Sequence, residues 1–227
     1  MNLIGIDISI DSTAVSILRR NDDLIISNFT TLKKNSKWIK KTMVSIDYEF
    51  IDYTYKDIDN YTECEIMKLR EYDHVTNLIY DKISSNIDKK DKSLIAVEGF
   101  NYGLKGNSII DIVSFSTILK LKLLNIYNLE KIIIVSPMTL KSFACEISYG
   151  YIIDKKGKKI INKNHNGISG GKFDKNDMIK SFFNMNQTDK LSIILNKYKD
   201  EILRLKHVCK PFDDIIDSNF LMLSLKN

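Results

Sequence analysis

Residues 1–30 decide the fold, and they read MNLIGIDISI DSTAVSILRR NDDLIISNFT. Three apolar stretches, 2–10, 13–19 and 24–30, are separated by Asp11-Ser12 and by the polar residues 20–23. Alternation of apolar and polar side chains with a period of two is typical of strands, and short polar stretches supply turns. The pattern predicts a β-meander of three antiparallel strands.

The rest of the chain alternates between short apolar strands and amphipathic helices. Residues 93–98 and 131–135 predict strands, and helices are expected at 63–87, 108–125, from 136 onward, 174–184, 189–205 and 211–225. Strands that alternate with helices pair in parallel. We therefore expect an α/β fold in which the antiparallel meander and the parallel strands form one mixed, five-stranded central sheet, flanked by helices.

Two segments interrupt this pattern, and we expect both to be insertions in a single domain that spans 1–227. Residues 33–62 begin with five lysines (Lys33, Lys34, Lys37, Lys40 and Lys41), continue with aromatic and acidic residues, and contain a strand candidate at 45–53. Residues 149–171 predict a hairpin around 155–157, followed by a polar loop. The aromatic residues of the first insertion either pack inside the protein or form a surface on which bases stack.

Composition indicates a folded protein with a mildly basic surface. Lys and Arg number 34 against 29 Asp and Glu, which gives a net charge of +5 and favours a polyanionic partner. Cys64, Cys145 and Cys209 are odd in number and far apart, so neither a disulfide framework nor a cysteine zinc site is expected. With no long apolar run and no leader pattern, the chain predicts an intracellular protein without a membrane partner.

Asp7 and Glu98 are the first candidate site residues. Asp7 shares one face of the first strand with Leu3 and Gly5, a pattern that also fits a strand with one wet face. Glu98 ends the apolar strand 93–98, and ligand sites of open α/β sheets lie at the carboxyl ends of strands. The alternative for Glu98 is a charge that ends the strand and points to water.

The last helix carries three more acidic residues, in PFDDIIDS at 211–218. Asp213 or Asp214 lies on the same helical face as Asp217, so their charges repel. The helix dipole explains acidic residues in the first turn, but Asp217 lies deeper, among apolar residues, where an unpaired carboxylate is costly. Mg²⁺ or Mn²⁺, two ions per site, would resolve the repulsion and would supply the chemistry of phosphodiester hydrolysis.

The order of these acidic residues resembles the RuvC branch of the RNase H-like nucleases, and most closely its phage and viral members. The resemblance is carried by IGID at 4–7, AVEG at 96–99 and DDIIDS at 213–218. GLKGNS at 103–108 and the apolar helix after it resemble the loop and dimer helix of phage-encoded members. SPMTLK at 136–141 and GGKFDK at 170–175 resemble the lysine motifs of the family.

The resemblance implies a homodimeric Holliday-junction resolvase that nicks branched double-stranded DNA. It implies metal binding by Asp7, Glu98, Asp214 and Asp217, with Asp213 as a further ligand candidate, and it places Lys141 and Lys175 near the scissile phosphate. DNA contacts are expected from Phe100, Tyr102, Lys105, Asn107 and Lys172. The family often has an aromatic residue three positions after the glutamate, whereas this chain has Asn101 there.

Other classes of protein fit the residues less well. Sugar-kinase or actin-like ATPases need a second phosphate hairpin, and neither a D-x-G-x-x-T motif nor a P-loop is present. Proofreading exonucleases usually carry D-x-E in the first strand, where this chain has Asp7-Ile8-Ser9. The lone pair His207 and Cys209 does not make a zinc site. A less specific RNase H-like nuclease and a non-catalytic nucleic-acid-binding scaffold remain as alternatives.

Overall fold

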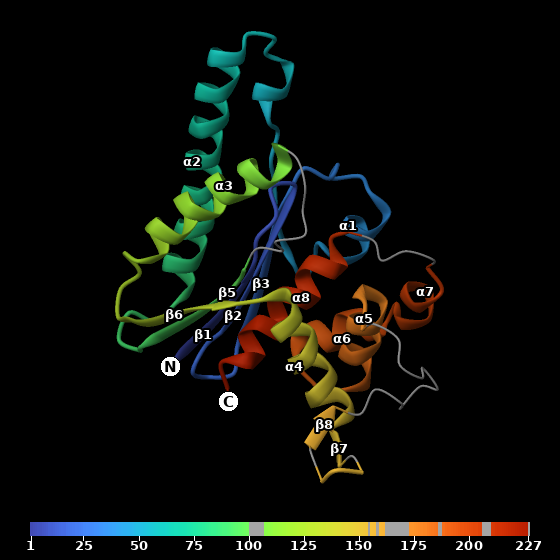
Figure 1. Cartoon of the computed structure of the whole chain (residues 1–227). Coiled ribbons are helices and arrows are strands. Elements are labelled where there is room, and N and C mark those ends of the chain that lie inside the picture. The colour runs from blue at the N-terminus through green and yellow to red at the C-terminus, as the bar shows by residue number, and fades with distance from the viewer. Residues whose placement is uncertain are drawn as a thin grey trace.

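A computed structural model describes residues 1–99, 107–153, 155–157, 159–161, 173–185, 188–205 and 210–226 (Figure 1). The core is a sheet whose strand order is β4-β3-β2-β1-β5-β6. Strands β1 (Asn2–Asp7), β2 (Ser12–Leu18) and β3 (Leu24–Thr30) form the predicted antiparallel meander. Strand β5 (Ser93–Glu98) pairs in parallel with β1, and β6 (Leu129–Val135) pairs in parallel with β5. The α/β class and the mixed sheet are therefore confirmed, and they are compatible with an RNase H-like fold.

The sheet has six strands, so the prediction of five was wrong. The additional strand is β4 (Asp47–Phe50), which pairs in parallel with the free edge of β3. The sequence marked a strand candidate at 45–53 but placed it in an insertion outside the sheet. Backbone pairing at a sheet edge needs only exposed N–H and C=O groups, which every strand presents, so side-chain patterns do not reveal it.

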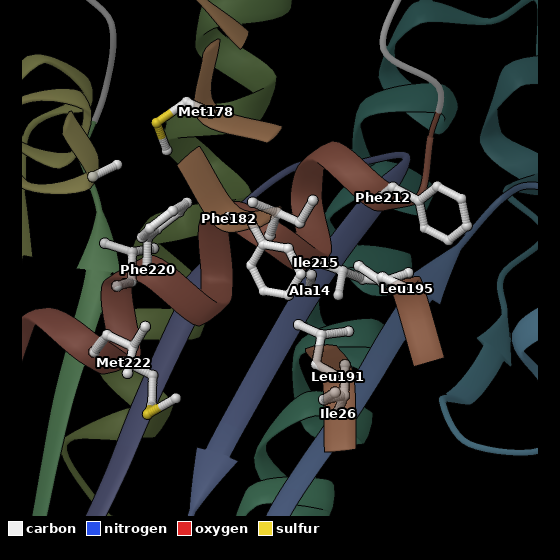
Figure 2. Packing of buried hydrophobic residues seen from close by; sticks show 14 of the residues in the cluster. Ala14, Ile26, Met178, Phe182, Leu191, Leu195, Phe212, Ile215, Phe220 and Met222 are labelled. Atoms are coloured by element: carbon white, nitrogen blue, oxygen red, sulfur yellow. The ribbon is translucent and has the colours of Figure 1, made fainter. Parts of the chain in front are cut away.

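Helices cover both faces of the sheet (Figure 1). One face packs against α2 (Tyr61–Asn86) and α3 (Asn107–Leu123), with the short η1 turn (Thr54–Asp57) beside α2. The other face packs against α8 (Phe212–Ser224), with α4 (Pro137–Tyr149), α5 (Lys175–Asn184) and α6 (Lys190–Asn196) outside it. Helices α1 (Lys37–Thr42) and α7 (Lys199–Leu203) lie on this second side. Figure 2 shows α8 and α6 side by side on the strands, with Ile215 of α8 near Ala14 and Leu191 of α6 near Ile26.

Strand β1 is buried on both faces, which corrects the expectation of one wet face. All of its residues are buried, because α8 lies directly on the side that carries Leu3, Gly5 and Asp7. A Cβ atom on Gly5 would lie 2.0 Å from the backbone oxygen of Ser218 and 2.3 Å from the backbone nitrogen of Met222. Gly5 therefore permits a close approach between strand and helix that any side chain would prevent.

Several helix boundaries differ from the prediction. The segment 189–205 forms two short helices instead of one: α6 ends at Asn196, and α7 begins at Lys199. Helix α8 begins at Phe212, with Pro211 as the preceding cap residue. Helix α4 begins as predicted, since the Ser136 side chain accepts a hydrogen bond from the Thr139 N–H and Pro137 follows it.

The second predicted insertion contains the expected hairpin. Strands β7 (Tyr151–Ile153) and β8 (Lys159–Ile161) pair antiparallel. The predicted loop at 162–171 lies outside the described residues. No helix in the described part of the chain combines the length and the apolar composition that crossing a bilayer requires.

The aromatic residues of the segment 33–62 are mostly internal. Trp38 is buried against Phe212, with 5.0 Å between ring centroids, and Tyr53 and Tyr55 are buried around Tyr72. These three rings pack inside the protein and are not available for base stacking, whereas Phe50 is exposed and Tyr48, which stacks on it, is half-buried.

Candidate active site

The parallel pairing of β1 and β5 brings two carboxylates to one edge of the sheet. Asp7 is the last residue of β1, and Glu98 is the last residue of β5. The first turns of α8 lie over the same edge and carry Asp214 and Asp217. These four side chains line one cavity of about 400 Å³, together with Ile8, Ser9, Gly99, Ile112, Pro137, Lys141, Lys175 and Lys210.

The three aspartates in this cavity are shielded from water, and Glu98 is half-buried. Asp7 is 4% exposed, Asp214 is 2% exposed and Asp217 is 8% exposed. Burial raises the pKa of Asp7 well above its ordinary value, and the charges of Glu98 and Asp214 raise it further. A side-chain interaction with Glu98 raises the pKa of Asp7 as well. The cluster therefore gains from any positive charge that enters it.

The same two causes act on the aspartates of α8. Burial raises the pKa of Asp217 well above its ordinary value, and the charge of Glu98 adds to the shift. For Asp214, burial and the Asp213 charge raise the pKa, while the Lys210 ammonium partly offsets them. A helix N-terminus stabilises acidic side chains only within its first turn, so it does not account for Asp217.

Two lysines neutralise part of this charge. Lys175 is the first residue of α5, which is held by a capping box between Asp174 and Asp177. Its Nζ atom lies 3.0 Å from Oδ2 of Asp213. Burial lowers the pKa of Lys175, but the Asp213 carboxylate more than compensates, so the net shift is upward. Lys175 therefore remains protonated at the mouth of the cavity.

Lys210 is a cavity residue that the sequence did not single out. Its Nζ atom lies 3.3 Å from Oδ2 of Asp214 and 3.3 Å from the Ser9 hydroxyl. The signal was present, because Lys210 precedes Asp214 by four residues, the spacing of a helical ion pair. Lys210 nevertheless precedes α8, which begins at Phe212, so helical spacing alone did not identify the pair.

A buried polar chain supports Asp214 from the sheet side. Asn28 on β3 is fully buried, and its Nδ2 atom donates to the Ser12 hydroxyl at 3.1 Å. The Ser12 hydroxyl hydrogen-bonds to Asp214, which lowers the pKa of that carboxyl. The sequence predicted Ser12 as a turn residue, but it opens β2 and is fully buried. The contact joins residues far apart in the chain, so local patterns could not reveal it.

The donor set fits a hard divalent cation by residue type. Carboxylate oxygens are the ligands that Mg²⁺ and Mn²⁺ prefer, and Oδ1 of Asp213 and Oδ2 of Asp214 are buried without a hydrogen-bond partner among the described residues. Oδ2 of Asp214 is close to Lys210 but lacks hydrogen-bond geometry. In the described ranges, no three His, Cys, Asp or Glu side chains are already arranged around one point as metal ligands. Ion binding would therefore require the carboxylates to turn away from the lysines and toward a common point.

The structure brings most of the predicted site residues together. Asp7, Glu98, Asp214, Asp217, Lys141 and Lys175 line the cavity, and Asp213 is buried beside it against Lys175. Asn107 is the first residue of α3. The remaining DNA-contact candidates, Phe100, Tyr102, Lys105 and Lys172, lie outside the described residues, as do His207 and Cys209.

Comparison with known proteins adds little to this picture. No protein-family model and no curated protein sequence matches the chain. Among solved structures, it is similar to a Thermus thermophilus RuvC structure with 9% sequence identity and a TM-score of 0.40. The match covers 100% of this chain and 96% of that chain. A similarity this low does not indicate the activity of the chain, so a function can be inferred only from the residues of the cavity.

Proposed function

We propose that this chain is a divalent-metal-dependent nuclease that hydrolyses phosphodiester bonds in branched DNA. The observation that carries the proposal is the cavity in which Asp7, Glu98, Asp214 and Asp217 converge, with lysines at its rim. Three buried aspartates and the half-buried Glu98 repel one another, which costs stability, and a structural role does not require such a cluster. A protein that only binds DNA gains nothing from negative charge that faces phosphates.

The residues divide into two roles. The four carboxylates would hold Mg²⁺ or Mn²⁺, with Asp213 as a further ligand candidate. When bound, two such ions supply an activated water and a counter-charge for the leaving oxygen. Lys141, Lys175 and Lys210 line the same cavity, and their ammonium groups would stabilise the charge that develops on the scissile phosphate.

The narrower activity, resolution of four-way junctions by a homodimer, is supported by the sequence resemblance. Helix α3 adds an observation, because its outer face exposes Ile110, Val113 and Leu121 at 38–63%. Their spacing places them on one helical face, where apolar side chains favour association. We expect a dimer by light scattering at micromolar concentration, and a monomer mass would remove this part of the proposal.

The deciding experiment compares wild type with Asp7→Asn on a four-way junction and on a linear duplex of the same length, with Mg²⁺ or Mn²⁺. We expect wild type to cut the junction in preference to the duplex and Asp7→Asn to cut neither. Equal cutting by both proteins would rule out the proposed metal site. Equal cutting of both substrates would leave a less specific nuclease, and binding without any cutting would favour a non-catalytic scaffold.

A further inference from the structure

The segment 31–46 is strongly basic, and it begins at the edge of the sheet that carries the cavity. Strand β3 runs parallel to β1, because both are antiparallel to β2, so β3 ends at the same edge as Asp7. The Thr31 N–H donates to the backbone oxygen of Asp11 at 2.9 Å, which ties the start of the segment to the loop that follows β1. The segment therefore leaves the sheet next to the carboxylate cluster.

Helix α1 is then fixed beside the N-terminal end of α8, as Figure 1 also shows. Trp38 packs edge-on against Phe212, the residue that directly precedes Asp213 and Asp214. The Tyr198 hydroxyl donates to the backbone oxygen of Lys41 at 3.3 Å, and Lys41 and Lys37 both pair with Glu201 of α7. These contacts bury one side of α1 and hold the helix against Phe212, at the start of α8.

The segment is positively charged, and ion pairs neutralise only part of that charge. The segment contains five lysines and no acidic residue, and those five equal the net charge of the whole chain. Lys37 and Lys41 share the single carboxylate of Glu201. Lys33, Lys34 and Lys40 are exposed, and in the described ranges none of them has an ion-pair partner.

We propose that residues 31–42 form a phosphate-binding surface that continues the active-site cavity. In this proposal, which rests on the proposed nuclease function, Lys33, Lys34 and Lys40 contact the backbone of the DNA arm that leaves the cavity. Ammonium groups on a docked helix bind phosphates of any sequence and release counterions. The surface therefore adds affinity without sequence preference, and it guides an arm of the substrate away from the carboxylates, which would otherwise repel it.

The test compares two variants with the same change in charge. The first is Lys33→Gln/Lys34→Gln/Lys40→Gln. The control is Lys89→Gln/Lys90→Gln/Lys92→Gln, because these exposed lysines precede β5 and lie at the opposite edge of the sheet from Glu98. Fluorescence anisotropy with a labelled four-way junction, in EDTA and over a range of salt concentrations, gives the affinity and its salt dependence. Thermal unfolding shows whether each variant is folded.

We expect the first variant to bind about tenfold more weakly at about 0.1 M salt, with the slope of log K against log salt reduced by up to about 3. The control should change both quantities much less. Equal losses of DNA affinity in the two variants would contradict the proposed phosphate-binding surface but not the proposed nuclease activity. A wild type without DNA affinity would overturn both, and a selective loss in a protein that never cuts DNA would support the surface and remove the nuclease.

Discussion

Replacing Gly5 by alanine is the most direct perturbation of the contact between strand and carboxylate-bearing helix. Gly5 is on β1, two residues before Asp7, and its missing side chain leaves room for α8. An added Cβ atom would lie 2.0 Å from Ser218 O and 2.3 Å from Met222 N, whereas non-bonded contacts need about 3.5 Å. Both atoms belong to the helix backbone, so no rotamer change relieves the clash, and α8 must move away from the sheet by about 1 Å or more.

The expected cost follows from this displacement. Overpacking of a core costs about 1–3 kcal/mol when side chains can adjust, and a backbone clash leaves less freedom to adjust. We expect Gly5→Ala to lower the free energy of unfolding by about 3 kcal/mol or more, even after the entropic gain of about 0.5–1 kcal/mol that alanine brings by restricting the unfolded chain. That loss is a large share of the stability of an ordinary domain, about 5–15 kcal/mol.

Urea unfolding followed by circular dichroism measures this cost, with Gly157→Ala as the matched control. Gly157 has φ of 75°, and an added Cβ atom there would meet nothing within 4 Å. Alanine at Gly157 should therefore cost only the left-handed backbone strain, about 1 kcal/mol. If Gly5→Ala costs no more than Gly157→Ala, the close approach of α8 to β1 is refuted.

Three further predictions concern the cavity. Because burial and neighbouring carboxylates raise the pKa of Asp7, the folded protein binds a proton more tightly than the unfolded chain, and metal-free stability should fall as pH rises above about 4. Asp7→Asn should therefore have a higher Tm than wild type in EDTA at neutral pH, and the difference should shrink as the pH falls toward about 4. If the Tm of the variant is not higher at any pH, the pKa of Asp7 is not raised. Lys210→Gln removes an ammonium from the cavity and should lower kcat about tenfold with little change in DNA affinity, whereas a change in affinity alone would assign Lys210 to binding. Ser12→Ala should weaken Mn²⁺ binding about tenfold in calorimetry, because Ser12 supports Asp214. The control Ser16→Ala removes a hydroxyl that hydrogen-bonds to Ser218 and should leave Mn²⁺ binding unchanged. Equal effects of the two substitutions would argue against a role of Ser12 in supporting Asp214.

The sequence predicted the parts of the fold that depend on local periodicity. The meander at 1–30 and the parallel strands were visible because alternation with a period of two reflects the two sides of a strand. The same reasoning placed Asp7 on the first strand and Glu98 at a strand end, and it singled out Asp217, whose apolar neighbours made a solvated surface position implausible. The parallel pairing of β1 and β5 then sufficed to bring these carboxylates to one edge.

Local patterns failed where a partner from a distant part of the chain decides the environment. The alternating face of β1 was consistent with water, but α8 covers it, and the only local trace of that helix is a glycine. Ser12 was assigned to a turn, although Asn28 and Asp214 make it part of a buried polar chain. Strand β4 was assigned to an insertion, although the free edge of β3 makes it part of the sheet.

The sequence by itself determined which residues alternate, which stretches are apolar and which carboxylates are costly to leave unpaired. Only the tertiary structure decided that four of those carboxylates share one cavity, that Lys210 joins them, and that Trp38 of α1 packs against Phe212 at the start of the same helix. The reason is physical: periodicity reports how a residue is oriented within its own strand or helix. Burial and charge compensation depend on which other elements pack against it, and here those elements come from opposite ends of the chain.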